Sequence, residues 1–333
     1  MSLETDLVGE PPAAHPEPTA TDPTATTTAE GCPNPMGWVQ VLDAFHLQST
    51  AWSVRVDGVS ISGRTIGTGR PIYFLNGLTG NSELFCLLVW LLRDEFRCVV
   101  LDYPAREERG PSQKVLTADG LAADLFAAAD QQGDKTFSVF ATSFGSAVAL
   151  AALEAGRGRI ERAILQAGFA HRSLSTFERL LCGIGKAVPG TLARLPFLET
   201  IQRANNQRYF PPFDASRLGF FIENAGHTLI RDAAERAALV GNFDFRPRLA
   251  EIRQPVLVVR SEHEGQVLAA CSDELARGLP HFSTEWLHTT GPLAHLAHPH
   301  RLAKLVRGFL TEAPVSGSEA GALHLEDAHG LDN

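Results

Sequence analysis

The sequence lacks any apolar run long enough to span a membrane. The longest candidate, around Leu84 to Leu92, is broken at once by Arg93-Asp94-Glu95. No basic stretch followed by an apolar one marks a secretory signal near the N-terminus. Cysteine is scarce: the 333 residues hold five, an odd number without C-x-x-C spacing, which is typical of reduced thiols. These absences predict a cytoplasmic protein with no membrane span.

Lysine and arginine are missing from both ends of the chain. The formal net charge is −9, but residues 1–35 hold six acids and residues 312–333 hold five, while the remainder carries a net charge of +2. Because the region between the acidic ends is nearly neutral, we expect no basic surface that binds nucleic acid. Residues 1–36 are also rich in Pro, Thr and Ala, and the C-terminal end is likewise acidic, so we expect disordered tails at 1–36 and 313–333 around one domain at 37–312.

Between the tails, strand-like and helix-like segments alternate. This alternation predicts an α/β fold with about eight strands, mostly parallel, and helices on both faces of the sheet. The expected strands are a hairpin over 52–66 and single strands over 71–75, 97–103, 136–140, 162–166, 256–259 and 282–287. The expected helices cover 82–93, 117–132, 147–153, 267–279 and 299–310.

One long interval, residues 169–248, interrupts the alternation and predicts a lid inserted above the sheet. It is rich in aromatic residues, some of which we expect to form the lid's own core and a few to face the site described next. They are Phe177, Phe197, Tyr209, Phe210, Phe213, Phe220, Phe221, Phe243 and Phe245.

The most informative segment is Ala141-Thr142-Ser143-Phe144-Gly145, which follows a β-rich run and leads into a helix of small residues. Strand, tight turn with a central serine, then helix is the pattern of a nucleophile elbow, which lifts the serine Oγ to the top of a sheet. The residues two before and two after the serine must be small, and Ala141 and Gly145 meet that need. The pattern predicts that Ser143 is a nucleophile.

Acyl transfer at a serine also needs oxyanion donors and an acid that orients the base. We expect the donors to be the backbone N–H groups of Phe144 and of Leu78, which follows Asn76-Gly77 in the loop after a buried strand. The acid is expected after the strand 256–259, where Glu264 is the first candidate and Glu262 the second. A solvated loop glutamate is an equally good interpretation of either one.

The histidine base is the weak point of the pattern. It is expected directly after Gly291, in the loop before the closing helix, but Pro292 occupies that place and has no titratable group. His295 lies three residues further on and is the best remaining candidate, ahead of His298 and His288. A serine hydroxyl without a base is a weak nucleophile at neutral pH.

Three histidines, His295, His298 and His300, lie close together in the sequence. Their spacing puts His300 on a different helical face from His295, and no fixed carboxylate completes a set of ligands. We therefore expect neither a metal site nor another cofactor.

From about Trp52 to Leu310 the chain resembles the α/β-hydrolase superfamily, and within it the non-catalytic group represented by maspardin. The resemblance rests on the segments 97–104, 141–145 and 163–177, and on a loop that begins at Gly291 without an adjacent histidine. The departures are Ala141 in place of the more usual Gly, and Glu264 as the acid.

Two functions follow as alternatives. The first is a serine hydrolase of a small apolar ester or amide, with Ser143 as nucleophile, His295 as a displaced base and Glu264 as the acid. The second is a degenerate fold kept for binding, whose lid holds an apolar ligand or a protein partner. Because one fold hosts many functions, the fold alone does not choose between them.

Overall fold

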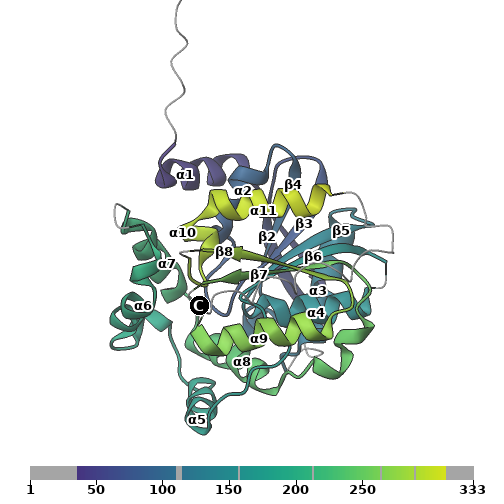
Figure 1. The fold of residues 1–333 in the computed structure, drawn as a ribbon. Helices are drawn as coiled ribbons and strands as arrows, with labels where there is room; N and C mark the ends of the chain where they lie inside the picture. The colour runs from purple at the N-terminus through teal and green to yellow at the C-terminus, as the bar shows by residue number, and fades with distance from the viewer. Residues whose placement is uncertain are drawn as a thin grey trace, which may run out of the picture. The chain divides into compact units, whose positions relative to one another are not determined.

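The described residues form a central sheet of eight strands (Figure 1). The computed structural model describes residues 36–109, 115–156, 158–211, 214–262, 265–288 and 290–312. In the described part, the strand order is β1-β2-β4-β3-β5-β6-β7-β8, with β2 antiparallel to β1 and β4 and all other pairs parallel. The strands are β1 (Thr50–Val56), β2 (Val59–Ile66), β3 (Arg70–Leu75), β4 (Phe96–Asp102), β5 (Phe137–Thr142), β6 (Ile160–Gln166), β7 (Val256–Ser261) and β8 (Phe282–Leu287).

The two outer strands form the expected hairpin. Asp57 and Gly58 connect β1 to β2, and both have positive φ angles, 50° and 85°. A two-residue turn with both φ positive matches the right-handed twist of the strands it joins. The hairpin fixes the antiparallel edge of a sheet that is otherwise parallel.

Helices cover both faces of the sheet, as the alternation of segments predicts. One apolar core packs the strands against α3 (Ala118–Gln131), α4 (Gly145–Ala155) and α9 (Gly265–Gly278). The other core packs them against α1 (Trp38–Gln48), α2 (Cys86–Leu92), α10 (Ala294–Ala297) and α11 (Pro299–Thr311). The central strands are continuous apolar runs because both of their faces are buried, and every residue of β5 is buried.

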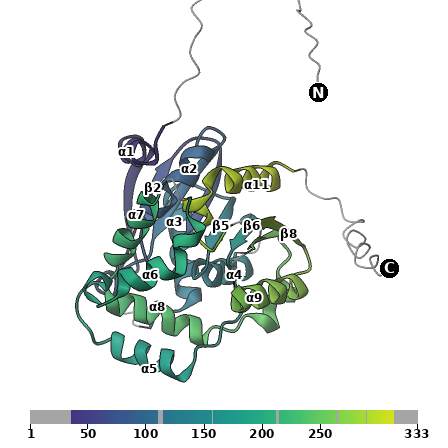
Figure 2. The same ribbon diagram turned by 60° about the vertical axis from the view of Figure 1, so that its left-hand side comes forward.

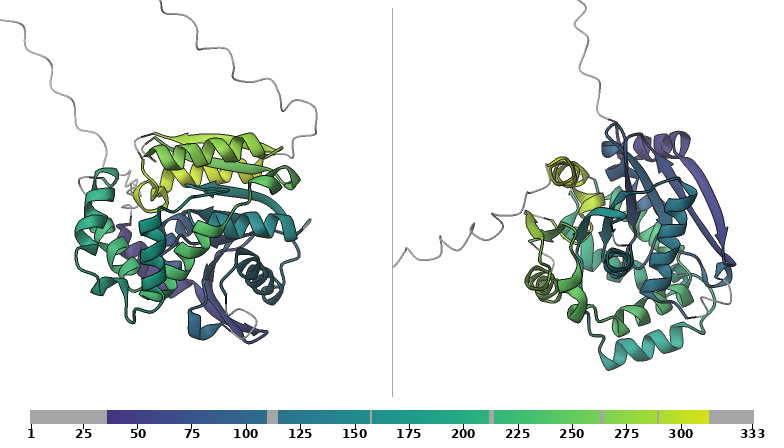
Figure 3. Two further views of the ribbon diagram at one scale, coloured as in Figure 1. Left: turned by 90° about the horizontal axis from the view of Figure 1, so that it is seen from below. Right: turned by 90° about the vertical axis from the view of Figure 1, so that its right-hand side faces the viewer.

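Between β6 and β7 the chain leaves the sheet and forms an insert of helices, which gather at one end of the sheet (Figure 3). They are α5 (Thr176–Gly185), α6 (Leu198–Asn206), α7 (Ser216–Gly226) and α8 (Ile230–Asn242). The interval 169–248 falls within this insert, and its role as a lid stays a prediction. None of the described helices is both long and apolar enough to cross a membrane.

The structure differs from the expected elements in three places. The helix expected over 82–93 begins as a 3-10 turn (Ser82–Phe85), capped by the side chain of Asn81. The helices α1 and α10 were not expected from the sequence. The predictions for the tails lie outside the described residues, since 1–35 and 313–333 are not described.

Candidate active site

Ser143 occupies a strained turn between β5 and α4. Its φ angle is +49°, in the left-handed region that residues with a Cβ rarely adopt. The Ser143 N–H donates to the carbonyl oxygen of Gln166 at 3.0 Å, and the Ser143 carbonyl accepts from the Ser146 hydroxyl at 2.5 Å. Two neighbouring elements therefore hold the turn in a conformation that it would not adopt alone.

Gly145 is required by the close approach of α4 to the end of β3. A Cβ at this position would lie 2.5 Å from the Leu75 carbonyl oxygen and 2.8 Å from that of Asn76. On the strand side of the turn, Ala141 is fully buried in the core. The close packing around these two positions therefore explains why they need small residues.

The two predicted oxyanion donors lie beside the serine. Among the described residues, the backbone N–H groups of Phe144 and Leu78 donate no hydrogen bond. A Cβ on Gly77 would lie 3.9 Å from the Ser143 Cβ, so the loop after β3 runs close to the serine. The Phe144 N–H also belongs to the N-terminus of α4, where the helix dipole favours negative charge.

A cavity of 370 Å³ opens at Ser143. The loop after β3 and the elbow form one wall, and the insert forms the other. The described lining residues are Leu78, Ser143, Phe144, Phe169, Arg172, Leu174, Glu178, Leu181, Cys182, Ala237 and Val240. The lining is largely apolar, and within the described part of the chain it contains no histidine.

None of the described aromatic residues named in the sequence analysis for the interval 169–248 lines the cavity at Ser143. Phe177 and Phe197 are 65% and 75% exposed, while Phe243 and Phe245 stack on each other in the core. The aromatic residue that the insert contributes to the cavity is Phe169, directly after β6. Phe213 lies outside the described residues.

His295, the predicted base, lies in α10 and is 2% exposed. Its ring packs on Phe85 at 5.1 Å between centroids, and Phe85 belongs to the core that α2 and α11 cover. Burial lowers the pKa of His295 to about 4, and its Nδ1 has no hydrogen-bond partner in the described part of the chain. Its role as a displaced base stays a prediction that needs α10 to move.

The loop after β8 is held by bonds to its backbone. The Gln166 side-chain Nε2 donates to the Pro292 carbonyl at 3.1 Å, and the Ser261 hydroxyl donates to the Gly291 carbonyl at 3.0 Å. A Cβ on Gly291 would lie 2.4 Å from the Tyr209 ring of the insert, so that ring covers the loop closely. Gln166 bonds to both Ser143 and Pro292, which places the loop next to the elbow.

Glu264, the predicted acid, lies outside the described residues. Glu262, the second candidate, directly follows β7 and is exposed. Its backbone N–H donates to the Leu287 carbonyl at the end of β8, at 3.3 Å. The choice between the two glutamates therefore stays open.

No group of three or more His, Cys, Asp or Glu side chains in the described ranges is placed to hold a metal ion. His298 is half-buried, and its pKa is lowered by burial and by the nearby Arg301 and Arg217. These positive neighbours are unfavourable for a bound cation.

Residues of the insert that were not predicted from the sequence hold the loop after β3. Arg236 of α8 donates to the Leu78 carbonyl at 3.2 Å, and the Gly80 N–H donates to the Thr228 hydroxyl at 2.9 Å. The Asn81 N–H donates to the Asn224 side chain at 3.0 Å. These partners are more than 140 residues away from the loop in sequence, and no local pattern marks them.

The sheet order, together with a strained serine between a parallel strand and a helix, defines the α/β-hydrolase class of proteins. The chain belongs to the alpha/beta hydrolase family, whose model matches residues 72–305. The broader resemblance seen in the sequence is thereby confirmed. The narrower resemblance to maspardin receives no support, because no curated protein sequence matches the chain.

Several solved structures share the fold at low sequence identity. A hydrolase from Pseudomonas aeruginosa PA01 has a TM-score of 0.67 and 18% identity, over 79% of this chain and 99% of that one. A thermophilic esterase from Thermogutta terrifontis has a TM-score of 0.65 and 19% identity, over 79% and 98%. An enol-lactonase from Burkholderia xenovorans LB400 has a TM-score of 0.65 and 21% identity, over 78% and 100%. At these identities the likeness concerns the fold.

Proposed function

We propose that this protein binds a small, largely apolar, ester-like compound in the cavity at Ser143 and hydrolyses it poorly or not at all. The observation that carries the proposal is the combination of a formed elbow with a cavity lining in which no described residue is a histidine. The carbonyl oxygen of the ligand would accept hydrogen bonds from the Phe144 and Leu78 N–H groups. The apolar side chains of the insert would cover the rest of the ligand.

The missing base explains why binding is favoured over turnover. Attack by Ser143 on a carbonyl carbon requires that its hydroxyl proton be transferred to a base within about 2.6–3.2 Å. Pro292 offers no such group, and His295 is buried against Phe85. Arg172 and Glu178 also line the cavity, and the Glu178 carboxylate accepts hydrogen bonds from the Ser175 N–H and hydroxyl, both at 2.8 Å. That carboxylate is thus already engaged in capping α5.

The second candidate function is a slow serine hydrolase. The strained Ser143 favours it, as do two nearby N–H groups that donate to no described residue. The similar structures named above include an esterase and an enol-lactonase. In this alternative, Ser143 attacks the carbonyl carbon, Phe144 and Leu78 stabilise the oxyanion, and His295 takes the serine proton after α10 has moved. Glu264 would then orient His295.

A restored histidine separates the two functions. In Pro292→His the new imidazole stands where a base is expected. Losing the base of a working triad costs up to about 10⁶ in turnover. We therefore expect Pro292→His to hydrolyse a p-nitrophenyl ester, through Ser143, at least roughly tenfold faster than wild type. A fluorophosphonate probe should label this variant faster than wild type. The matched controls are Pro292→Ala, which removes the proline alone, and Ser143→Ala in the Pro292→His background.

Two results would contradict the proposal that the cavity binds an ester-like compound and that the missing base is what prevents its turnover. One is ester turnover by the wild type that depends on Ser143 and falls within the usual range of about 1–10³ s⁻¹; the hydrolase would then stand, and His295→Ala would test its base. The other is a folded Pro292→His protein with no gain in labelling or turnover. That would show that something other than the missing imidazole limits the site.

A further inference from the structure

A second cavity, of about 430 Å³, lies where the insert meets the last helix, α11 (Figure 2). Its walls come from distant parts of the chain: residues 208–211 and Arg217 belong to the insert, and residues 297–301 lead into α11. The described lining has no residue in common with that of the cavity at Ser143. The protein therefore has a second cavity of the size that small-molecule sites usually have.

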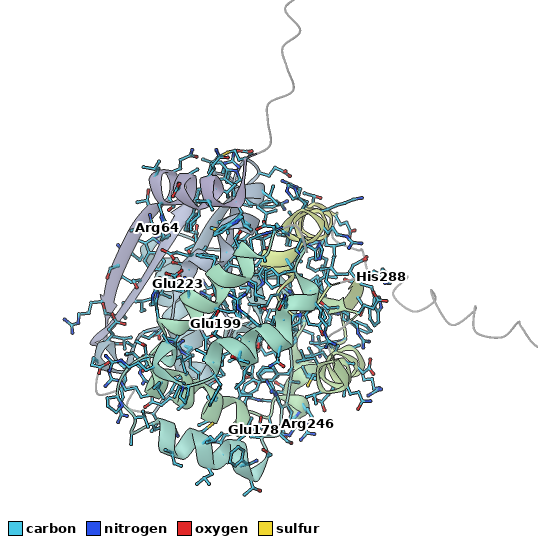
Figure 4. All side chains as sticks on the ribbon, turned by 90° about the vertical axis from the view of Figure 1, so that its left-hand side faces the viewer. Arg64, Glu178, Glu199, Glu223, Arg246 and His288 are labelled. Carbon is cyan, nitrogen blue, oxygen red and sulfur yellow. The ribbon has the colours of Figure 1, made fainter. Side chains whose placement is uncertain are left out.

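The charged side chains in the described lining of this cavity are all basic. Arg208, Arg217 and Arg301 contribute the charge, and the described lining contains neither Asp nor Glu. Two acids of the insert that Figure 4 labels, Glu199 of α6 and Glu223 of α7, are not part of it. A cleft lined by charge of one sign concentrates ions of the opposite sign.

The three arginines differ in what already balances their charge. Arg217 forms an ion pair with Asp214 at 2.8 Å. The Arg301 Nη1 donates to the backbone carbonyl oxygen of His288 at 2.8 Å, and a carbonyl carries no net charge. Arg208 is exposed and forms no ion pair with any acid that the structure describes. The three arginines together with Asp214 leave an excess of positive charge at the cavity.

The rest of the lining is largely apolar. Tyr209, Phe210, Ala297 and Pro299 are buried. His298 adds a neutral polar group, because burial and the nearby arginines lower its pKa, and its side chain is hydrogen-bonded to the backbone of Tyr209. An apolar lining with a few polar groups is typical of a site for a small organic molecule.

The N-terminus of α11 belongs to the same cavity wall. The helix has 13 residues and begins at Pro299, and the His298 side chain does not cap it. His300 and Arg301 lie in its first turn, where the helix dipole favours negative charge. The helix thus adds to a preference that the arginines already establish.

We propose that this cavity binds a small amphiphilic oxyanion, a compound that carries a carboxylate or phosphate group on an apolar body. Arg208 and Arg301 hold the oxyanion, because a guanidinium group matches carboxylate and phosphate oxygens with parallel N–H donors. The aromatic residues Tyr209 and Phe210 contact the apolar body. Binding here does not require the cavity at Ser143 to be occupied or active.

Isothermal titration calorimetry with the full chain tests the proposal. The probes are phenyl phosphate and benzoate, together with benzyl alcohol, which has no charge, and inorganic phosphate, which has no apolar body. We expect at least one of the two aromatic anions to bind roughly tenfold or more tightly than benzyl alcohol and inorganic phosphate. High salt should weaken its binding, since charge is screened. The tighter aromatic anion identifies the preferred head group.

The double variant Arg208→Gln/Arg301→Gln removes the charge that holds the oxyanion. We expect it to lower the affinity for the tighter aromatic anion by roughly tenfold or more. Arg217 is left unchanged because its Nη1 also donates to the carbonyl oxygens of Leu296 and Ala297, at 2.9 and 3.3 Å. Its loss would therefore disturb α10 as well as the cavity.

The matched control is Arg55→Gln/Arg277→Gln. Both arginines are exposed and lie outside the described lining, so the control loses the same charge elsewhere on the surface. It should bind the aromatic anion as wild type does. Unchanged thermal midpoints in both double variants show that the fold is kept.

Arg172→Gln separates this cavity from the one at Ser143, which Arg172 lines. We expect this variant to bind the aromatic anion as wild type does. If it loses as much affinity as the double variant, the anion binds at Ser143 and the proposal is overturned. The proposal also fails if neither aromatic anion binds, if benzyl alcohol or inorganic phosphate binds as tightly, or if Arg208→Gln/Arg301→Gln binds as well as wild type.

Discussion

The turn after β5 and the loop after β8 lie at the same edge of the sheet, since both follow parallel strands. They differ in whether they hold the residue that a serine hydrolase needs at that place. The turn keeps a strained serine and a glycine that the packing requires. The loop keeps its backbone bonds to Gln166 and Ser261 but has Pro292 where a base is expected. The comparison shows that the architecture of such a site is maintained by packing and backbone hydrogen bonds, and that its chemistry is a separate requirement.

The largest expected effect is on the pH dependence of stability. It comes from His295, which lies in α10, after the loop that follows β8. If His295 is a core residue, its pKa of about 4 in the folded protein lies below the usual 6.5, so the unfolded chain binds more protons between these values. The free energy of unfolding should therefore fall as pH drops from about 6.5 to 4, by about 3 kcal/mol in the limit. Above pH 6.5 this contribution does not change.

Urea unfolding at several pH values measures this effect, with His295→Leu as the comparison. The variant has no buried imidazole to protonate, so the difference in stability between the two proteins isolates His295 from the other titrating groups. An identical pH dependence in both proteins would show that His295 is hydrated or paired in the folded state, which is what a displaced base requires.

The next largest effect on stability concerns the turn after β5. Gly145→Ala places a Cβ 2.5 Å from the Leu75 carbonyl oxygen, so α4 must move away from β3. We expect a loss of about 2 kcal/mol, as for other overpacked sites, and a fall of several degrees in the thermal midpoint. Gly183→Ala, on the exposed part of α5 where a Cβ meets nothing within 4 Å, is the control and should not destabilise.

The smallest expected effect concerns the loop after β3, which the insert holds close to Ser143. Arg236→Met removes the hydrogen bond to the Leu78 carbonyl and so loosens the backbone that presents the Leu78 N–H. In the Pro292→His background, we expect fluorophosphonate labelling to slow by roughly fivefold, equivalent to about 1 kcal/mol. Arg248→Met is the control, since Arg248 pairs with Glu154 outside the cavity. Equal labelling rates would mean that the loop keeps its position without Arg236.

Much of the fold could be predicted because its signals are local. The run Phe137–Thr142 is apolar throughout, the Asp57-Gly58 pair fits one type of turn, and β8 has the bounds expected for it. The elbow was visible for the same reason, since its serine and small residues are adjacent in sequence.

The rest of the site could not be predicted because it depends on contacts between distant segments. Nothing around Arg236 signals a bond to Leu78, and nothing around Gln166 signals a bond to Pro292. The burial of His295 depends on Phe85, which lies more than 200 residues earlier. The helix α10 has only four residues, too few to show a helical period.

Cys182 in the cavity wall makes the site accessible to thiol chemistry. It is partly exposed, and burial raises its pKa, so alkylation should be slow at neutral pH and faster in mild alkali. Cys86, Cys98 and Cys271 are buried, and burial raises the pKa of Cys86 to about 12. Once Cys32, which lies outside the described residues, is replaced by serine, a single fluorophore on Cys182 would report directly whether the cavity is occupied.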